Sequence, residues 1–161
     1  MGVTRRDAST PEDRTVIASL NHVGITVTDL DASRVFYVEV VGMQVVVPSF
    51  RTGGQWFDVL TENSGAVIDA AMLSAGGTTV QLVQYHEGGE PDAVTGHNRV
   101  GNLHLSIDVD DVDAKYAQLK DRPGLHPTPV VWLPIDGFKS FYVRDPDGVP
   151  VEFLESPRRQ G

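Results

Sequence analysis

Apolar and polar residues alternate along several short runs of this chain, which is the pattern of strands with one buried face. The first run is Ser19–Thr28, and Ala32–Val41 then carries apolar residues at helical spacing behind the helix-capping residues Asp29 and Asp31. Further strands are predicted at Met43–Val47, Ala66–Leu73 and Thr78–Tyr85, with a long loop at Ser49–Gly65. Residues 19–86 are therefore predicted to form a βαβββ module.

The same order of elements is predicted again after a glycine-rich segment. Leu103–Val109 alternates as a strand does, and Val112–Lys120 carries apolar residues on one helical face. Three more strands are predicted at Pro127–Leu133, Lys139–Arg144 and Val149–Glu155. The predicted organisation is a tail at 1–18, a first module at 19–86, a linker at 87–101, a second module at 102–156 and a tail at 157–161. Two βαβββ modules in tandem predict an α+β fold with curved mixed sheets around a cleft.

The two modules begin with related sequences. Leu20–Asp31 aligns with Asn102–Asp113, and this places His22 on His104. A duplicated strand that carries one histidine per copy predicts two half-sites that face each other across a pseudo-twofold axis. Such an arrangement can build a metal site in a small protein.

Each module also ends with a strand that carries a polar residue between apolar neighbours. Gln81 holds this place in the first module and Glu152 in the second. Strand alternation puts Gln81 on the face opposite to Val80 and Leu82. A buried glutamate is costly unless a cation compensates its charge, so Glu152 is a further candidate for a metal site.

Composition narrows the functional classes. The 161 residues contain no cysteine, so disulfides, thiolate nucleophiles and sulfur-bound metals are excluded, and a cytoplasmic location is expected. The net charge of −9 and the lack of a basic patch argue against nucleic acid as a partner. No window is long and apolar enough to cross a bilayer, so no membrane partner is expected.

Two segments resemble the vicinal oxygen chelate superfamily, which comprises the glyoxalases, methylmalonyl-CoA epimerases, bleomycin resistance proteins and extradiol dioxygenases. They are His22–Val27, followed by Phe36-Tyr37 and Val41-Gly42, and Phe141–Phe153, which contains Asp145-Pro146-Asp147-Gly148. The resemblance covers about residues 19 to 156. It implies a metal-binding cleft, a small-molecule substrate with neighbouring oxygens, and a homodimer.

The resemblance also implies a set of metal ligands, which is similar to that of the epimerase branch. The matching positions here are His22, Gln81, His104 and Glu152. Two imidazoles and two oxygen donors suit one borderline divalent ion per site, such as Zn, Ni, Co, Mn or Fe. With one anionic ligand the site keeps a net positive charge, which favours an enolate or another anion with vicinal oxygens.

Catalysis further requires a proton shuttle, and the resemblance points to Asp69 on the strand before Gln81, with Glu152 assisting. A buried position between Ile68 and Ala70 is expected to raise the pKa of Asp69. The leading hypothesis is a metal-dependent lyase or epimerase of the glyoxalase type. The alternatives are an extradiol dioxygenase using Fe(II) with His22, His104 and Glu152, a metal-dependent thiol transferase, and a drug-binding resistance protein.

Overall fold

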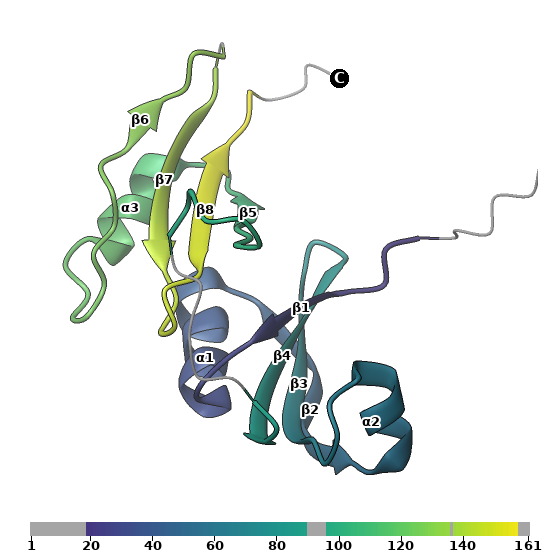
Figure 1. Cartoon of the computed structure of the whole chain (residues 1–161). Helices are drawn as coiled ribbons and strands as arrows, with labels where there is room; N and C mark the ends of the chain where they lie inside the picture. The colour runs from purple at the N-terminus through teal and green to yellow at the C-terminus, as the bar shows by residue number, and fades with distance from the viewer. Residues whose placement is uncertain (1–18, 90–95, 136, 158–161) are drawn as a thin grey trace, which may run out of the picture.

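The computed structural model describes residues 19–89, 96–135 and 137–157. Within these ranges the chain forms two βαβββ modules, each with its own four-stranded mixed sheet (Figure 1). The predicted fold class, α+β with two tandem modules, is confirmed. The predicted tail at 1–18 lies outside the described residues, as do 90–95 of the predicted linker and 158–161 of the predicted C-terminal tail.

The first sheet has the order β1-β4-β3-β2, with β1 parallel to β4 and the other pairs antiparallel. The second sheet repeats this order as β5-β8-β7-β6, with β5 parallel to β8. The strands of the first sheet are β1 (Val23–Thr26), β2 (Gln44–Gly53), β3 (Val67–Ala75) and β4 (Thr78–Glu87). Those of the second are β5 (Leu105–Asp108), β6 (Val131–Trp132), β7 (Lys139–Arg144) and β8 (Pro150–Glu155).

Each parallel crossover contains a helix that begins at an aspartate of the repeated sequence. The Asp29 side chain accepts a hydrogen bond from Ala32 N, 2.9 Å away, at the start of α1 (Leu30–Phe36). Asp111 accepts the equivalent bond from Ala114 N, at 2.8 Å, before α3 (Val112–Leu119). Because a side-chain oxygen satisfies a free N–H of the first turn, each aspartate fixes the start of its helix. α3 begins at the predicted Val112, whereas α1 begins at Leu30, two residues before the predicted start, and Asp31 lies in its first turn.

The first helix changes its winding before it ends. The predicted helix over Ala32–Val41 is an α-helix only as far as Phe36 and continues as a π-helical turn, η2 (Tyr37–Val41). The Tyr37 carbonyl accepts bonds from both Gly42 N and Met43 N, at 3.1 and 2.9 Å. Gly42 then ends the helix with φ of 97°, a left-handed conformation that glycine adopts without a Cβ clash.

The predicted loop at Ser49–Gly65 is wrong as far as Thr61. β2 runs on to Gly53 through two register shifts, and α2 (Gln55–Thr61) follows it. The bulges break the alternation on which the prediction of strand length depended. α2 packs on the sheet through Phe57, whereas Trp56 and Val59 are exposed on its outer side. At the other end of the chain, β6 is shorter than the predicted Pro127–Leu133 strand.

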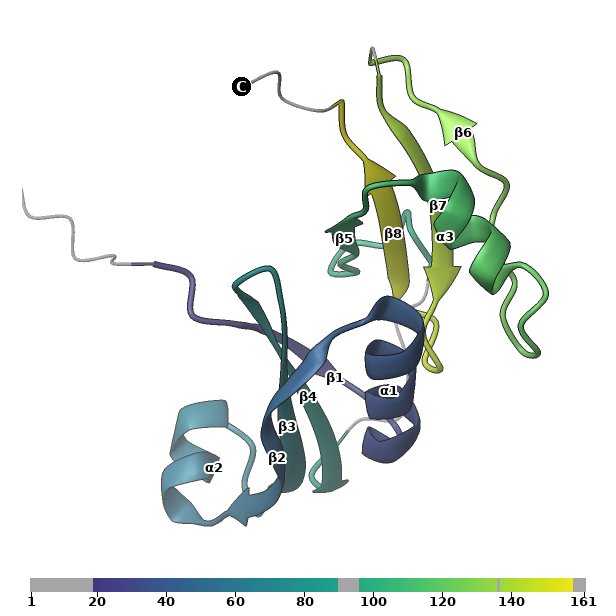
Figure 2. The same cartoon turned by 180° about the vertical axis from the view of Figure 1, so that it is seen from behind.

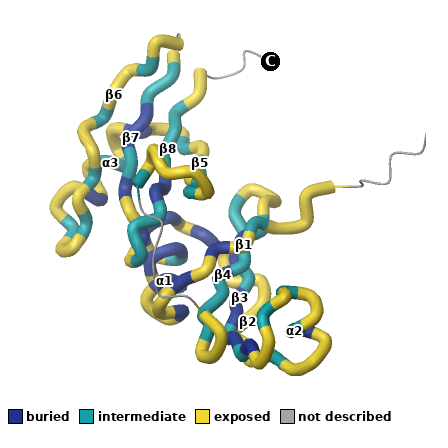
Figure 3. The backbone as a smooth tube through the Cα atoms, in the orientation of Figure 1, coloured by how far each residue is buried: buried dark blue, intermediate teal, exposed yellow. Residues whose placement is uncertain are grey.

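One hydrophobic core joins the two modules. α1 lies against β3 and β4, and α3 lies against β7 and β8 (Figure 2). The helix-covered faces of both sheets belong to a single buried cluster, and Figure 3 shows its buried segments around α1 and along β7 and β8. The Tyr37 hydroxyl donates to Asp145 Oδ2 across the module boundary at 3.0 Å, and Lys115 Nζ donates to Val40 O at 2.7 Å. The modules therefore pack through their helical sides.

None of the helices among the described residues has the length and apolarity that crossing a membrane requires.

Candidate functional site

The first predicted half-site lies on the sheet face that α1 does not cover. β1 pairs with β4 so that Gly24 lies beside Gln81. Because side chains alternate along strands, His22 and Gln81 face the same side, opposite to the buried Ile25 and Leu82. The His22 side chain is exposed, and its Nδ1 lies 2.7 Å from Asn21 Oδ1. The first sheet thus brings one imidazole and one amide to one face.

The second predicted half-site repeats this register. β5 pairs with β8 so that Ser106 lies beside Glu152, and His104 stands two residues before Ser106. His22 stands at the same offset before Gly24, so each histidine takes the same place relative to the predicted oxygen ligand of its sheet. The structure therefore brings His104 and Glu152 to one face, opposite to the core.

Neighbouring side chains support Glu152. The Ser140 hydroxyl donates to Glu152 Oε1 at 2.6 Å, and Tyr142 lies directly across from Glu152 in the β7–β8 pair. Burial, followed by the nearby charge of Glu152, raises the pKa of the Tyr142 hydroxyl. Carboxylates that bind metals are themselves held by such hydrogen bonds. The donor atoms of this half-site and the hydrogen bond to Glu152 are therefore compatible with metal binding.

The two half-sites do not meet within one chain. Among the described residues, no group of three His, Cys, Asp or Glu side chains is arranged to hold a metal ion. The described residues of one chain thus do not gather the predicted ligands around one point, and the ligand set stays a prediction. The physical reason is the shared core: the helical sides of both sheets merge in it, and both ligand-bearing faces point away from it.

Asp69 differs from its prediction in position and in the direction of its pKa shift. It lies beside Gln84 in the β3–β4 pair, whereas Gln81 lies beside Met72, so Asp69 and Gln81 occupy opposite faces. The Arg51 guanidinium donates to both Asp69 oxygens at 2.8 and 2.9 Å, and His86 Nε2 lies 2.8 Å from Oδ2.

The hydrogen bonds from Arg51 and then from His86 hold the pKa of Asp69 well below its usual range and outweigh the opposite effect of burial. The expectation of a raised pKa is wrong, because sequence neighbours do not reveal cross-strand partners. Asp69 is the centre of an ion-pair cluster here, and a proton-transfer role for it stays a prediction that its placement disfavours.

Three polar residues near the second half-site were not among the predicted site residues: Ser140, Tyr142 and His97. The tight turn at 145–148 fixes the β7–β8 register, and this register could have paired Tyr142 with Glu152. The position of His97 in the linker carries no comparable signal. Its ring lies 4.8 Å from the ring of Tyr142, which in turn lies 6.0 Å from the ring of His104.

A cleft of about 750 Å³ runs beside the free edge of β1. Its walls include residues 24–28, the end of β4 with the two glycines after it (85–89), and the segment 101–103 that leads to the second module. His86 lines it, but none of the four predicted ligands does. The cleft is large enough for a small molecule, and it adjoins the edge of the first half-site at Gly24.

Comparison with known proteins decides the family. A model of the Glyoxalase/Bleomycin resistance protein/Dioxygenase superfamily matches residues 19–153. The chain belongs to this superfamily. The match includes both modules and all four predicted ligands, so the resemblance seen in the sequence is confirmed.

The curated relatives of this superfamily member include epimerases. A 2-epi-5-epi-valiolone epimerase of Actinomyces sp is 30% identical over 146 residues, which cover 86% of this chain and 80% of the relative. The mitochondrial methylmalonyl-CoA epimerase of Mus musculus is 29% identical over 156 residues, with 87% of this chain and 74% of the relative covered.

Among solved structures, a glyoxalase family protein from Bacillus cereus matches with a TM-score of 0.76 at 19% identity, covering 89% of this chain and 97% of the other. At this identity the match shows the fold alone. Membership supports a metal-dependent enzyme of the glyoxalase or epimerase type at the level of the superfamily, and the epimerase relatives favour an isomerase.

Proposed function

We propose that this protein is a divalent-metal-dependent enzyme that moves a proton next to a carbonyl group, with epimerisation as the favoured reaction. The substrate is a small molecule with two neighbouring oxygens. The observation that carries the proposal is the repeated register, in which each sheet presents one histidine and one oxygen donor on its open face. The epimerase relatives support the reaction class.

The proposed ligands are His22 and Gln81 from one sheet and His104 and Glu152 from the other. A divalent ion bound there would polarise the substrate carbonyl and lower the energy of an enolate. Ser140 holds the Glu152 carboxylate in one orientation, which keeps its second oxygen from turning away. Because only Glu152 is anionic, the filled site would favour an anionic intermediate over the neutral substrate.

We further propose that the complete site forms between two copies of the chain. The half-sites of one chain lie on faces directed away from its core, so the first half-site needs the second half-site of a partner. A homodimer with twofold symmetry would contain two such sites, each built from both chains. Figure 1 shows the two sheets as separate elements within one chain.

A complementation experiment tests both parts of the proposal. One variant, His22→Ala, loses the first half-site, and another, His104→Ala, loses the second. Each is expected to bind no metal and to show no activity alone. After the two variants are unfolded together and refolded, about half of the dimers should be mixed, and each mixed dimer should contain one intact site. The mixture should therefore bind about half a metal ion per dimer, whereas the wild type should bind about two per dimer.

The control is a double variant, H22A with H104A, refolded with each single variant, which cannot rebuild a site in any arrangement. No recovery in the first mixture, with metal still bound by the wild-type chain, would place all ligands in one chain and reject the shared site. Full metal uptake by Glu152→Ala would reject the ligand set.

The reaction class is tested by screening turnover with acyl-CoA epimers, methylglyoxal–thiol adducts and catechols. Cleavage of a catechol would reject the proposed epimerase and identify the protein as a dioxygenase.

A further inference from the structure

An apolar row crosses the open face of the first sheet and begins at Gln81. In the β3–β4 pair Gln81 lies beside Met72, and in the β2–β3 pair Met72 lies beside Val47. Residues that are paired across a sheet turn their side chains to the same face. Met72 and Val47 therefore continue the face of the proposed ligand out to the edge strand β2, in steps of about 5 Å per strand.

The next row along the same face ends at Phe50 on β2 and is apolar as well. Phe57 of α2 packs over the inner part of this second row. Phe50 and Val47 keep 39% and 37% of their surface exposed, and Met72 is half-buried. Apolar surface thus remains open beside Gln81, where α2 does not cover the sheet.

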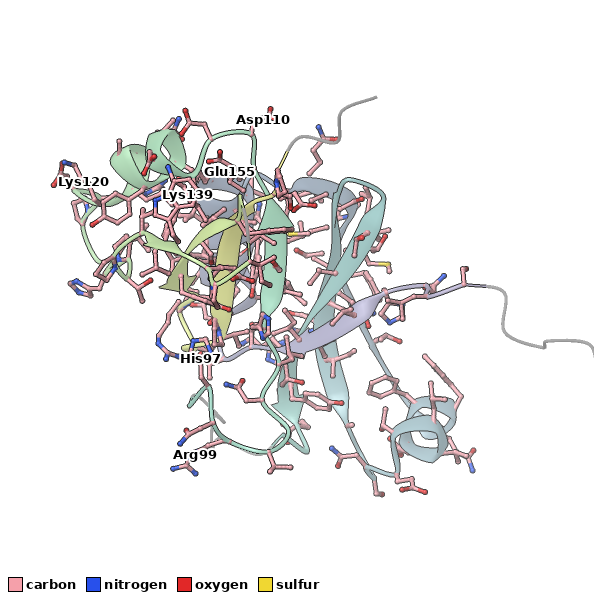
Figure 4. All side chains as sticks on the ribbon, turned by 90° about the horizontal axis from the view of Figure 1, so that it is seen from above. His97, Arg99, Asp110, Lys120, Lys139 and Glu155 are labelled. Atoms are coloured by element: carbon pink, nitrogen blue, oxygen red, sulfur yellow. The ribbon has the colours of Figure 1, made fainter. Side chains whose placement is uncertain are left out.

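Among the described residues, no lysine or arginine of the first module lies on this face. Residues 19–86 contain two arginines and no lysine. Arg34 lies on α1, where it pairs with an aspartate of the same helix at 3.1 Å. Arg51 donates to both oxygens of Asp69 on the opposite face. The three lysines of the chain belong to the second module, and Figure 4 shows Lys120 and Lys139 on the side of α3, away from the first sheet.

The open face of the second sheet is polar by contrast. Ser140 and Tyr142 lie next to Glu152 on this face, and Ser106 is paired with Glu152 from the other side. Arg144, at the end of β7, shares the face and donates to a backbone oxygen of its own turn at 2.7 Å. A site built from one sheet of each kind has an apolar wall and a polar wall. Polar groups of a substrate therefore belong at the second sheet, and hydrocarbon belongs at the first.

We propose that the substrate of this site carries an uncharged hydrocarbon group, a chain or a ring, next to its two neighbouring oxygens, and that Met72, Val47 and Phe50 select this group. The inference rests on the proposed function. A group that extends from Gln81 toward the edge strand crosses Met72 and then Val47. Its burial there is favourable because apolar surface of both partners leaves water. A carboxylate or phosphate at the same place would lose water without gaining a cationic partner from this sheet.

Alkyl hydroxamates test the inference, because a hydroxamate presents two neighbouring oxygens to a metal and its chain can be varied alone. The full-length protein is loaded with Zn²⁺, and calorimetry compares acetohydroxamate with octanohydroxamate. The longer chain should bind about 10- to 100-fold more tightly, since each fully buried methylene adds about fourfold in affinity and the sheet covers one side of the chain. Suberic monohydroxamate, whose chain of the same length ends in a carboxylate, should lose this gain.

Two valines of β2 provide matched variants. Val47 and Val45 are similarly exposed, at 37% and 41%, but Val45 lies beside Leu73, on the opposite face of the sheet. Val47→Lys should abolish the advantage of octanohydroxamate over acetohydroxamate and should tighten binding of the carboxylate-ended chain. Val45→Lys should bind all three compounds as the wild type does. The gain for the carboxylate-ended chain separates a change of specificity from a damaged fold.

The outcomes separate the two proposals. If the loaded protein binds acetohydroxamate but octanohydroxamate binds no more tightly, or if Val45→Lys removes the advantage as fully as Val47→Lys, the hydrocarbon selectivity is overturned and the proposed function stands. If the protein binds neither Zn²⁺ nor acetohydroxamate, the proposed function is overturned and the selectivity with it. If Val47→Lys does not fold, Val47→Ser takes its place and should lose part of the advantage, and an unchanged advantage overturns the selectivity.

Discussion

A buried hydrogen bond between Tyr37 and Asp145 joins the two modules. The variant Tyr37→Phe should measure how much this bond contributes to the free energy of unfolding. Both residues are buried, with 0% and 5% of their surface exposed. Asp145 Oδ1 accepts from the backbone of Asp147 and Val149, whereas its Oδ2 accepts from the Tyr37 hydroxyl at 3.0 Å. Loss of the hydroxyl leaves Oδ2 without this donor and removes no ring contact.

A hydrogen bond to a charged buried group contributes roughly 1.5–3 kcal/mol, so we expect Tyr37→Phe to lower the free energy of unfolding by about 2 kcal/mol. For a chain of this size that corresponds to a fall in Tm of roughly 4–8 °C. The assay is urea unfolding followed by tryptophan fluorescence. Tyr116→Phe is the control, because Tyr116 also packs its ring in the core, against Phe141, and its hydroxyl makes no hydrogen bond to the described residues.

The pH dependence gives a second check. Burial raises the pKa of Asp145 above its ordinary 3.8, and the Tyr37 hydrogen bond opposes that rise. Without the hydroxyl the pKa rises further, so the deficit of Tyr37→Phe should grow as pH rises through the folded-state pKa of Asp145 and shrink in acid, where the carboxyl is protonated. A loss below about 0.5 kcal/mol, or one that is the same at pH 4 and pH 7, would refute the reasoning.

Three further predictions concern the sheets and the site. Because the pKa of Asp69 is lowered, its ion pairs should stabilise the fold above pH 3.8 and cease to do so as pH falls through the folded-state pKa. Asp69→Asn should remove this acid dependence in thermal scans and should keep turnover. Lost turnover would instead restore Asp69 as the proton-transfer base. Gly53→Ala should cost about 1–3 kcal/mol in urea unfolding, since a Cβ there would lie 2.7 Å from a backbone oxygen, while Gly24→Ala, which meets nothing within 4 Å, should be neutral. Ser140→Ala should weaken metal binding by about 10- to 100-fold in calorimetry because Glu152 loses its hydrogen bond, and an unchanged affinity would remove Ser140 from the site.

The sequence allowed the modules to be predicted because their signals are local. Alternation predicts strands, and the predicted capping residue Asp29 precedes the first helix, although the second candidate, Asp31, lies within it. The same alternation correctly predicts that Gln81 faces away from Val80 and Leu82. The part of β2 beyond Val47 was missed because its bulges shift the pleat, and α2 was missed because seven residues after two glycines carry a weak helical pattern.

The site was harder to predict, because it depends on how distant segments meet. The repeat pairs His22 with His104 in sequence, but the packing of the helical sides decides where their faces point. Asp69 shows the same limitation: its neighbours in sequence are apolar, whereas its partners Arg51 and His86 come from the adjacent strands. His97 lies in a linker without periodicity, and only the folded chain reveals its contact with Tyr142.

The merged core also separates stability from chemistry. The residues that hold the fold together, such as Leu82 and Phe153, alternate along the same strands with those that face the open side, such as Gln81 and Glu152. Substitutions on the open side therefore leave most of the buried apolar contacts intact, since successive side chains point in opposite directions. A scaffold of this kind can acquire new substrates by exchanging the residues of this face that α2 does not cover, at little risk of unfolding.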